Sequence, residues 1–359
     1  MKLPLLAIAL LVTQAPAGVL YYLPFATGYN PAAVVEDGLV GQGVAGHGNF
    51  VATPSPAVGW DTDLLPTSLR YADSAGNALV TTGGAAYIDT SEETGTVSNI
   101  APLMLTGVNA PAGQSIWLSF IGQQTAGTTA RFFNLSLRAP DNTVLYPGNV
   151  GDSGTSPDEV CAFGMQSGSV SQVWQVWDRS TKAVGSTVRG TIIPSTNLVF
   201  ILARVDLNYD GNKDRFTMWV NPPLGSAPAE ADGVSFVSTN TDFNGWADLD
   251  HIRLAAGYQD ATGPSSSWKV DEIRIGDTRE DVCPYLPFTL TSVTLPTGEM
   301  RVTWQAAPGF TDTVEWSDDL GVWHPYAASS RVNPPGSVTA TWDTPVISAS
   351  RYFLRVTRL

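Results

Sequence analysis

An acidic turn between two apolar runs is the part of this chain best suited to bind an ion. Oxygen-bearing residues alternate along it, at Asp206, Asn208, Asp210, Asn212 and Asp214. Calcium prefers about six to eight hard oxygen ligands, and this spacing can curl several of them around one ion. We therefore expect Ca²⁺ to be held by the four side chains Asp206, Asn208, Asp210 and Asp214 and by the backbone carbonyl of Asn212.

The same turn has a plainer interpretation. Thr217 stands where a calcium loop of this spacing supplies a bidentate Glu. A ligand would therefore have to come from another loop, and a strand rather than a helix is predicted to follow. The alternative is a polar hairpin, in which Asp and Asn side chains hydrogen-bond their own backbone.

The other reactive side chains do not form a recognisable catalytic set. Asp271 and Glu272 are neighbours on a predicted strand, so their side chains should point to opposite faces, as charges at a strand edge. The three His residues are scattered, and no Gly-x-Ser-x-Gly nucleophile turn is present. The sequence therefore predicts a protein that is not an enzyme.

Aromatic residues near polar loops are candidates for sugar binding. Trp174 lies in a short strand pattern, while Trp246 and Tyr258 lie in or beside predicted loops rich in Asn and Asp. An aromatic ring can pack on the C–H face of a sugar while carboxylates and amides bind its hydroxyls. We expect these three rings to contact a ligand; the alternative is that they belong to the core.

Composition indicates an all-β exported protein. The 359 residues include 34 Gly and 25 Pro, and only 14% are charged, whereas ordinary soluble domains have roughly a quarter. The apolar fraction of 43%, with 11 Trp, is enough to bury a core. A formal net charge of −14 repels phosphate backbones, so nucleic acid is not an expected partner.

The N-terminus has the pattern of a secretory leader. Lys2 precedes an apolar run over residues 3–12, and Ala15-Pro-Ala17 resembles a cleavage site. We expect a signal peptide over 1–17, no membrane span, and a secreted, extracellular or cell-surface location. In that compartment the two cysteines, Cys161 and Cys283, can form a disulfide; two buried thiols are the alternative.

Apolar alternation predicts strands along much of the chain. Ile116, Leu118 and Phe120 share one face of a strand over 115–121, and residues 133–137 repeat the pattern. Residues 198–205 are apolar on both faces, as in a central strand covered on each side. Residues 26–67 are rich in Gly, Pro and Asp and are expected to form long loops. No helix of ordinary length is expected.

The order of strand patterns at 198–205, 215–221, 249–255 and 268–275 resembles the closing half of the concanavalin A-like jelly roll, in its laminin-G-like form. That resemblance implies an antiparallel β-sandwich over residues 18–284. Beyond it, Ser317, Asp319, Leu320 and Trp323, followed by an Arg-rich aromatic end, resemble a small fibronectin-like β-sandwich module over 288–359.

The jelly-roll resemblance implies a non-catalytic protein that binds glycans or an extracellular polysaccharide. Hydrolases of that fold carry a Glu-x-Asp-x-x-Glu strand, and its alginate lyases carry a Tyr-Phe-Lys strand; this chain has neither. The alternatives are a structural, self-associating protein of the cell envelope or matrix, and a polysaccharide-active hydrolase or lyase.

Overall fold

The structure is a computed structural model. It describes residues 19–25, 51–52, 61–89, 96–102, 115–125, 132–139, 158–165, 173–178, 187–189, 197–210, 213–237, 251–257, 267–326, 331–333, 339–344 and 353–358. The predicted leader over 1–17 lies outside these residues. In the part of the chain that is described, no helix has the length and apolar character needed to cross a membrane.

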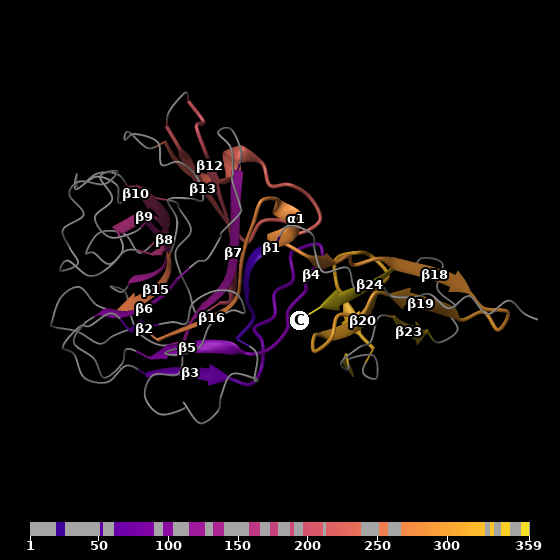
Figure 1. Ribbon diagram of the computed structural model, residues 1–359. Helices are drawn as coiled ribbons and strands as arrows, with labels where there is room; N and C mark the ends of the chain where they lie inside the picture. Colours follow the sequence, from indigo (N-terminus) through magenta and orange to yellow (C-terminus); the bar gives the residue numbers. More distant parts are fainter. Residues whose placement is uncertain are drawn as a thin grey trace, which may run out of the picture.

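Two large antiparallel sheets form most of the fold (Figure 1). The eight-stranded sheet runs β14 (Val234–Val237), β13 (Arg215–Val220), β12 (Val199–Asp206), β7 (Ser115–Gln124), β16 (Trp268–Gly276), β5 (Ala85–Asp89) and β3 (Asp61–Leu65), and β1 (Val19–Leu23) also pairs with β16. The seven-stranded sheet runs β11 (Thr187–Arg189), β10 (Trp174–Asp178), β9 (Asp158–Met165), β8 (Phe132–Ala139), β15 (His251–Gly257), β6 (Thr96–Pro102) and β2 (Val51–Ala52).

The larger hydrophobic core lies between these two sheets. Ile116, Leu118 and Phe120 of β7 point into it, as their alternation predicts. Phe133 of β8 also lies in this core, with its ring centroid 5.8 Å from that of Phe120 and 4.8 Å from that of Trp268. The predicted antiparallel β-sandwich is therefore confirmed.

The eight-stranded sheet is buried on its outer face as well. Phe200 and Leu202 of β12 belong to a second core with Tyr71, Leu79 and other side chains from beyond the sheet. Three segments supply this covering layer: residues 66–84 with β4 (Ala78–Leu79), residues 221–233 with the short 3₁₀ helix η2 (Glu230–Asp232), and helix α1 (Arg279–Val282). The expectation that residues 198–205 are covered on both faces is thus confirmed.

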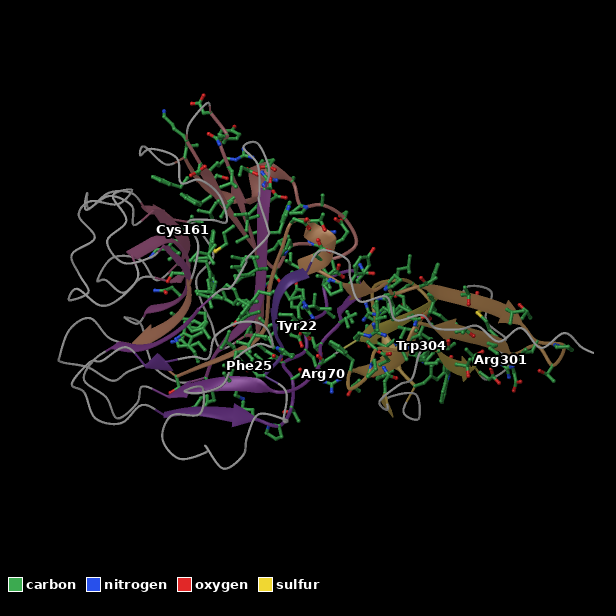
Figure 2. The ribbon with its side chains drawn as sticks, viewed as in Figure 1. Tyr22, Phe25, Arg70, Cys161, Arg301 and Trp304 are labelled. Carbon is green, nitrogen blue, oxygen red and sulfur yellow. The ribbon has the colours of Figure 1, made fainter. Side chains whose placement is uncertain are left out.

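The two cysteines lie in different cores. Cys161 of β9 is buried between the two large sheets, and Figure 2 shows it inside the sandwich. Cys283 follows α1 and is buried in the covering layer, on the other side of the eight-stranded sheet. Both are buried thiols, so the predicted disulfide is wrong. Because burial raises the pKa of Cys283 to about 11, its thiol stays protonated.

The C-terminal strands form two smaller sheets, at the right of Figure 1. One runs β18 (Leu290–Thr294), β19 (Met300–Trp304) and β23 (Ala340–Asp343). The other contains β21 (His324–Pro325), β20 (Thr311–Ser317) and β22 (Arg331–Val332), with β24 (Phe353–Arg358) paired to β20. A two-residue strand, β17 (Tyr285–Leu286), pairs with β4 of the covering layer. The likeness of these sheets to a fibronectin-like module stays a prediction.

The segment expected to form long loops contains strands. Within residues 26–67, β3 is an edge strand of the eight-stranded sheet and β2 is an edge strand of the seven-stranded sheet. The expectation of loops is wrong at these two places. The short sequences Val51–Ala52 and Asp61–Leu65 carry too few alternating apolar residues to reveal edge strands, which gain much of their order from the neighbouring strand.

A buried ion pair joins the last strand, β24, to β20, and its arginine also bonds to the covering layer. Arg358 of β24 and Asp312 of β20 are 2.8 Å apart, with side chains 1% and 0% exposed. Asp312 also accepts hydrogen bonds from Trp304 Nε1 (2.8 Å) and Asn333 Nδ2 (2.6 Å). Arg358 in turn donates to the carbonyl of Gly76, at 3.0 Å. Its guanidinium therefore connects the C-terminal sheets with the sandwich.

We expect Asp312→Ala to lower the free energy of unfolding of the C-terminal sheets by about 3–5 kcal/mol, because it leaves the Arg358 charge buried without its carboxylate. Urea denaturation followed by tryptophan fluorescence measures this, since Trp304 bonds directly to Asp312. Asp343→Ala is the matched control, because Asp343 pairs on the surface with Arg301, which Figure 2 shows toward the far end of these sheets. Equal unfolding midpoints for the two variants would contradict a stabilising role for the buried pair.

Candidate functional site

The acidic turn joins β12 to β13 as a hairpin. Asp206 lies directly opposite Arg215 in the strand register. Its Oδ2 accepts hydrogen bonds from Arg204 Nη2 (2.9 Å) and Arg215 Nε (2.8 Å), and its Oδ1 accepts one from Ser115 Oγ (2.6 Å). Two guanidinium cations therefore occupy the position where an ion was expected, and the prediction that Asp206 is a calcium ligand is corrected.

The other described residues of the turn do not converge on a common point. Asp214 is buried and accepts the backbone N–H of Asn208 at 3.0 Å, while Asn208 adopts a left-handed backbone conformation with φ of 54°. Asp210 is exposed and lies 3.9 Å from Lys213. Asn212 lies outside the described residues. Side chains that bond their own backbone are typical of the polar hairpin, and the binding of calcium here stays a prediction.

The aromatic candidates fare differently. Trp174 is 1% exposed and belongs to the core between the sheets, where its ring meets that of Trp268 edge-to-face at 6.0 Å. The expectation that Trp174 contacts a ligand is therefore wrong. The large ring of Trp174 faces the core because burial of its apolar area is favourable. Trp246 and Tyr258 lie outside the described residues.

A different tryptophan lies at the surface of the sandwich. Trp117 of β7 is half-buried on the outer face of the eight-stranded sheet, opposite the face that carries Ile116 and Leu118. Its ring stacks on that of Trp219 of β13, with centroids 5.9 Å apart and an interplanar angle of 16°. The guanidinium of Arg204 lies over both rings, at 5.3 and 5.4 Å from their centroids.

These groups line an open cavity of about 600 Å³, here called the Trp117 cavity. Its walls come from the end of the eight-stranded sheet, from residues 227–230 of the covering layer, and from the start of α1. The lining residues with polar or aromatic side chains are Ser115, Trp117, Arg204, Glu230, Asp277, Thr278, Arg279 and Glu280. The cavity thus combines one flat apolar ring with several hydrogen-bonding groups.

The wall of the cavity is fixed by specific contacts. Trp219 Nε1 donates to the carbonyl of Ala229 at 2.9 Å, which holds the covering segment against the sheet. A Cβ atom at Gly233 would lie 2.8 Å from Trp219 Nε1, so glycine is required for this close approach. Arg204 bridges Asp206 and Glu230, the latter at 2.8 Å. The ring of Trp117 and the guanidinium above it are therefore held in place.

Sequence reasoning missed Trp117, although a signal for it was present. The alternation of Ile116, Leu118 and Phe120 assigns these three residues to the core. Trp117 must therefore face away from that core, because successive side chains of a strand point to opposite faces. A large aromatic on the second face of an otherwise regular strand indicates either another core or a binding surface.

A second cluster of ionisable side chains lies at a bulge in β16. The pairing of β16 with β7 shifts register between Asp271 and Arg274, and Glu272 has a φ of 55°. Asp271 and Glu272 are both 0% exposed. The expectation that they lie at a strand edge and face opposite ways is wrong, because the bulge lets both carboxyl groups reach the covering segment 66–84.

The bonds of this cluster hold the covering segment. Asp271 Oδ2 accepts the backbone N–H of Leu69 (2.8 Å), and Glu272 Oε1 accepts that of Thr82 (2.6 Å). Glu272 also pairs with Arg274 and accepts the Tyr22 hydroxyl at 2.9 Å. Figure 2 shows Tyr22 on the side of the sandwich that faces the C-terminal sheets. Buried carboxyl groups that accept backbone N–H bonds fix a segment in place.

Burial changes the acidity of these groups. Desolvation, and then the neighbouring charge of Glu272, raises the pKa of Asp271 to about 9. Desolvation, and then the charge of Glu272, raises the pKa of Tyr22 to about 12. Asp271 is therefore protonated and neutral at pH 7 in the folded protein, and it contributes no negative charge beside Glu272.

Comparisons with known proteins found distant structural similarity and no sequence match. No protein-family model matches the chain, and no curated protein sequence matches it. A carbohydrate esterase from the Shiga toxin-encoding bacteriophage phi24B is similar, with 17% identity and a TM-score of 0.35 over 61% of this chain and 90% of that chain. A Lotus tetragonolobus seed lectin has 11% identity and a TM-score of 0.32, over 61% and 93%. A family 7 alginate lyase has 14% identity and a TM-score of 0.32, over 59% and 84%. Such low scores decide neither ligand nor reaction.

We expect Asp271→Asn to weaken the dependence of stability on pH. The folded-state pKa is raised from 3.8 to about 9, so the folded protein retains a proton that the unfolded chain releases. The stability that this proton provides is complete below about pH 4 and is lost as the pH rises to about 9. The urea midpoint of unfolding, measured at several pH values in this window, should fall more steeply with rising pH for the wild type than for the variant. Asp343→Asn, which changes an exposed carboxylate, should keep the wild-type slope of urea midpoint against pH. If Asp271→Asn also keeps that slope, the raised pKa of Asp271 is contradicted.

Proposed function

We propose that this chain is an exported, non-catalytic glycan-binding protein, and that a sugar binds in the Trp117 cavity. The observation that carries this proposal is that the half-buried Trp117 ring lines an open cavity together with arginine and carboxylate groups. A pyranose presents an apolar C–H face and a rim of hydroxyls. An aromatic ring can pack on that face while charged and polar side chains hydrogen-bond the hydroxyls.

The size and rigidity of the cavity support this function. Its volume of about 600 Å³ falls in the range of small-ligand sites, roughly 300–1,000 Å³. The stacking of Trp117 on Trp219 and the bonds from Arg204 to Asp206 and Glu230 fix the polar and aromatic groups before a ligand arrives. A site that is ordered in advance loses less side-chain entropy on binding.

Trp117→Ala should abolish or weaken glycan binding by at least about tenfold, because a buried aromatic at the centre of an interface commonly contributes 2 kcal/mol or more. A glycan array would identify the ligand, and calorimetry would give the affinity of the wild type and variants. Trp323→Ala is the matched control, since Trp323 also lies beneath an arginine, Arg355 at 4.2 Å, but in the C-terminal sheets.

Circular dichroism must show that both tryptophan variants remain folded. Trp117→Phe provides a second test, because it keeps an aromatic face and should retain part of the affinity. Wild-type affinity in Trp117→Ala would contradict the assignment of the Trp117 cavity as the glycan-binding site. The same titration with EDTA tests the predicted calcium: a loss of binding on chelation would support a calcium site, and unchanged binding would contradict a role for the ion in glycan binding.

A second candidate function is self-association through the C-terminal sheets. Four large apolar side chains are exposed there, at Leu290, Val293, Leu320 and Val322, with 42%, 56%, 56% and 57% of their surfaces accessible. Exposed apolar groups that gather on one part of a protein commonly mark a contact surface. If they do so here, sedimentation velocity should show oligomers of the wild type and monomers of Leu320→Ser/Val322→Ser; a monomeric wild type would remove this candidate.

A further inference from the structure

We propose that β18, the strand at the open edge of the C-terminal sheets, pairs with β18 of a second copy of this chain. This inference rests on self-association, the second candidate function, and it names the strand and the pairing that produce it. The Trp117 cavity plays no part in it, so glycan binding can be measured independently.

β18 is paired along one edge. Among the described strands it pairs with β19 alone. The carbonyl of Thr289 accepts the backbone N–H of Gln305, and the N–H of Leu295 donates to the carbonyl of Glu299, so the odd-numbered positions bond toward β19. In an antiparallel ladder the intervening residues turn their N–H and C=O groups the other way. The groups directed to the open edge are those of Leu290, Ser292 and Thr294.

An apolar groove lies beside this edge. Leu290 and Ser292 share the inner face of their sheet with Met300 and Val302 of β19, and these four residues line a cavity of about 290 Å³. The other residues that line the cavity are Leu320, Trp323, Phe353 and Leu354. Val302 is buried in the core of the C-terminal sheets, whereas all of β18 is exposed. The core is therefore covered as far as β19 and is open beneath β18.

A β-strand is the occupant that satisfies both features. Its backbone would pair with the outward groups of β18, and its alternate side chains would lie over the groove. A helix or a small apolar ligand would fill the groove but leave the backbone groups without partners. Proteins commonly protect such an edge with a charged side chain or a proline. β18, with the sequence Leu-Thr-Ser-Val-Thr, contains neither, so it is open to strand pairing.

The open edge is complementary to itself. When two β18 strands run antiparallel about a two-fold axis at Ser292, Ser292 faces its counterpart and Leu290 faces Thr294 of the second copy. All three positions direct their N–H and C=O groups toward the partner strand, so donors meet acceptors. Because β18 carries no charge, two chains of formal net charge −14 can meet here without like charges in contact. A contact that uses the same surface on both copies closes as a dimer.

Sedimentation velocity of the full chain at rising concentration should show a reversible equilibrium of monomer and dimer, because a strand of 5 residues pairs over a small area. Ser292→Pro should abolish the dimer, since it removes an outward N–H and places a ring at the edge, a position where proline is tolerated. Ser292→Ala is the matched control, because it keeps the N–H and should dimerise like the wild type. Circular dichroism checks that both variants remain folded.

Hydrogen exchange followed by NMR tests the pairing in the wild type, without any substitution. The amides of Thr291 and Val293, which bond toward β19, should exchange slowly at every concentration. The amides of Leu290, Ser292 and Thr294 should become protected only at concentrations where the dimer forms.

Three outcomes would overturn the inference. A wild type that stays monomeric removes self-association as well. A dimer that persists in folded Ser292→Pro, or one in which the outward amides of β18 stay unprotected, keeps self-association but excludes pairing through this edge. None of these outcomes bears on the Trp117 cavity, whose glycan binding is measured by calorimetry.

Discussion

The burial of the eight-stranded sheet on both faces is the constraint on which the other features depend. Phe200 and Leu202 alternate with Ile201 and Ala203 along β12, and all four are fully buried. A sheet that is apolar on both sides needs a further layer, because each exposed large side chain would cost about 1.5–3 kcal/mol relative to burial. The segments 66–84 and 221–233 and helix α1 supply that layer. The Trp117 cavity lies where the layer ends, so it is a consequence of how the sheet is covered.

Irregular segments can form such a layer only if their polar backbone groups find partners. The chain meets this need with buried carboxyl groups. Asp73 accepts the N–H groups of Ala75, Asn77 and Leu224 and so joins the two covering segments, at 2.8–3.0 Å. Asp271 and Glu272 do the same from the sheet. Because a buried polar group without a partner is costly, each of these bonds restricts the layer to one arrangement.

The strands that carry the core were predictable from the sequence, while the covering layer was not. Ile116, Leu118 and Phe120 are assigned correctly by period-two alternation, and residues 198–205 by their apolar character on both faces. The layer has no period, since its order comes from contacts such as Asp73 with Leu224, which are 151 positions apart. The bulge at Glu272 is hidden for the same reason: a register shift depends on the partner strand and leaves no mark on the local sequence.

In the acidic turn, the partners of Asp206 determine whether its carboxylate is available to bind an ion. Asp206 and Arg215 face each other across the hairpin, and Arg204 lies two positions before Asp206, on the same face of β12. The spacing of acids along the turn suggests an ion, but Arg204 on the same strand and Arg215 across the hairpin supply two cations to Asp206. The carboxylate that would have bound calcium instead orients Arg204 over Trp117 and Trp219. An ion that drew Asp206 away would release that guanidinium and disturb the aromatic wall, so the two uses of Asp206 exclude each other. The order of the Trp117 cavity thus depends on the ion pairs of Asp206.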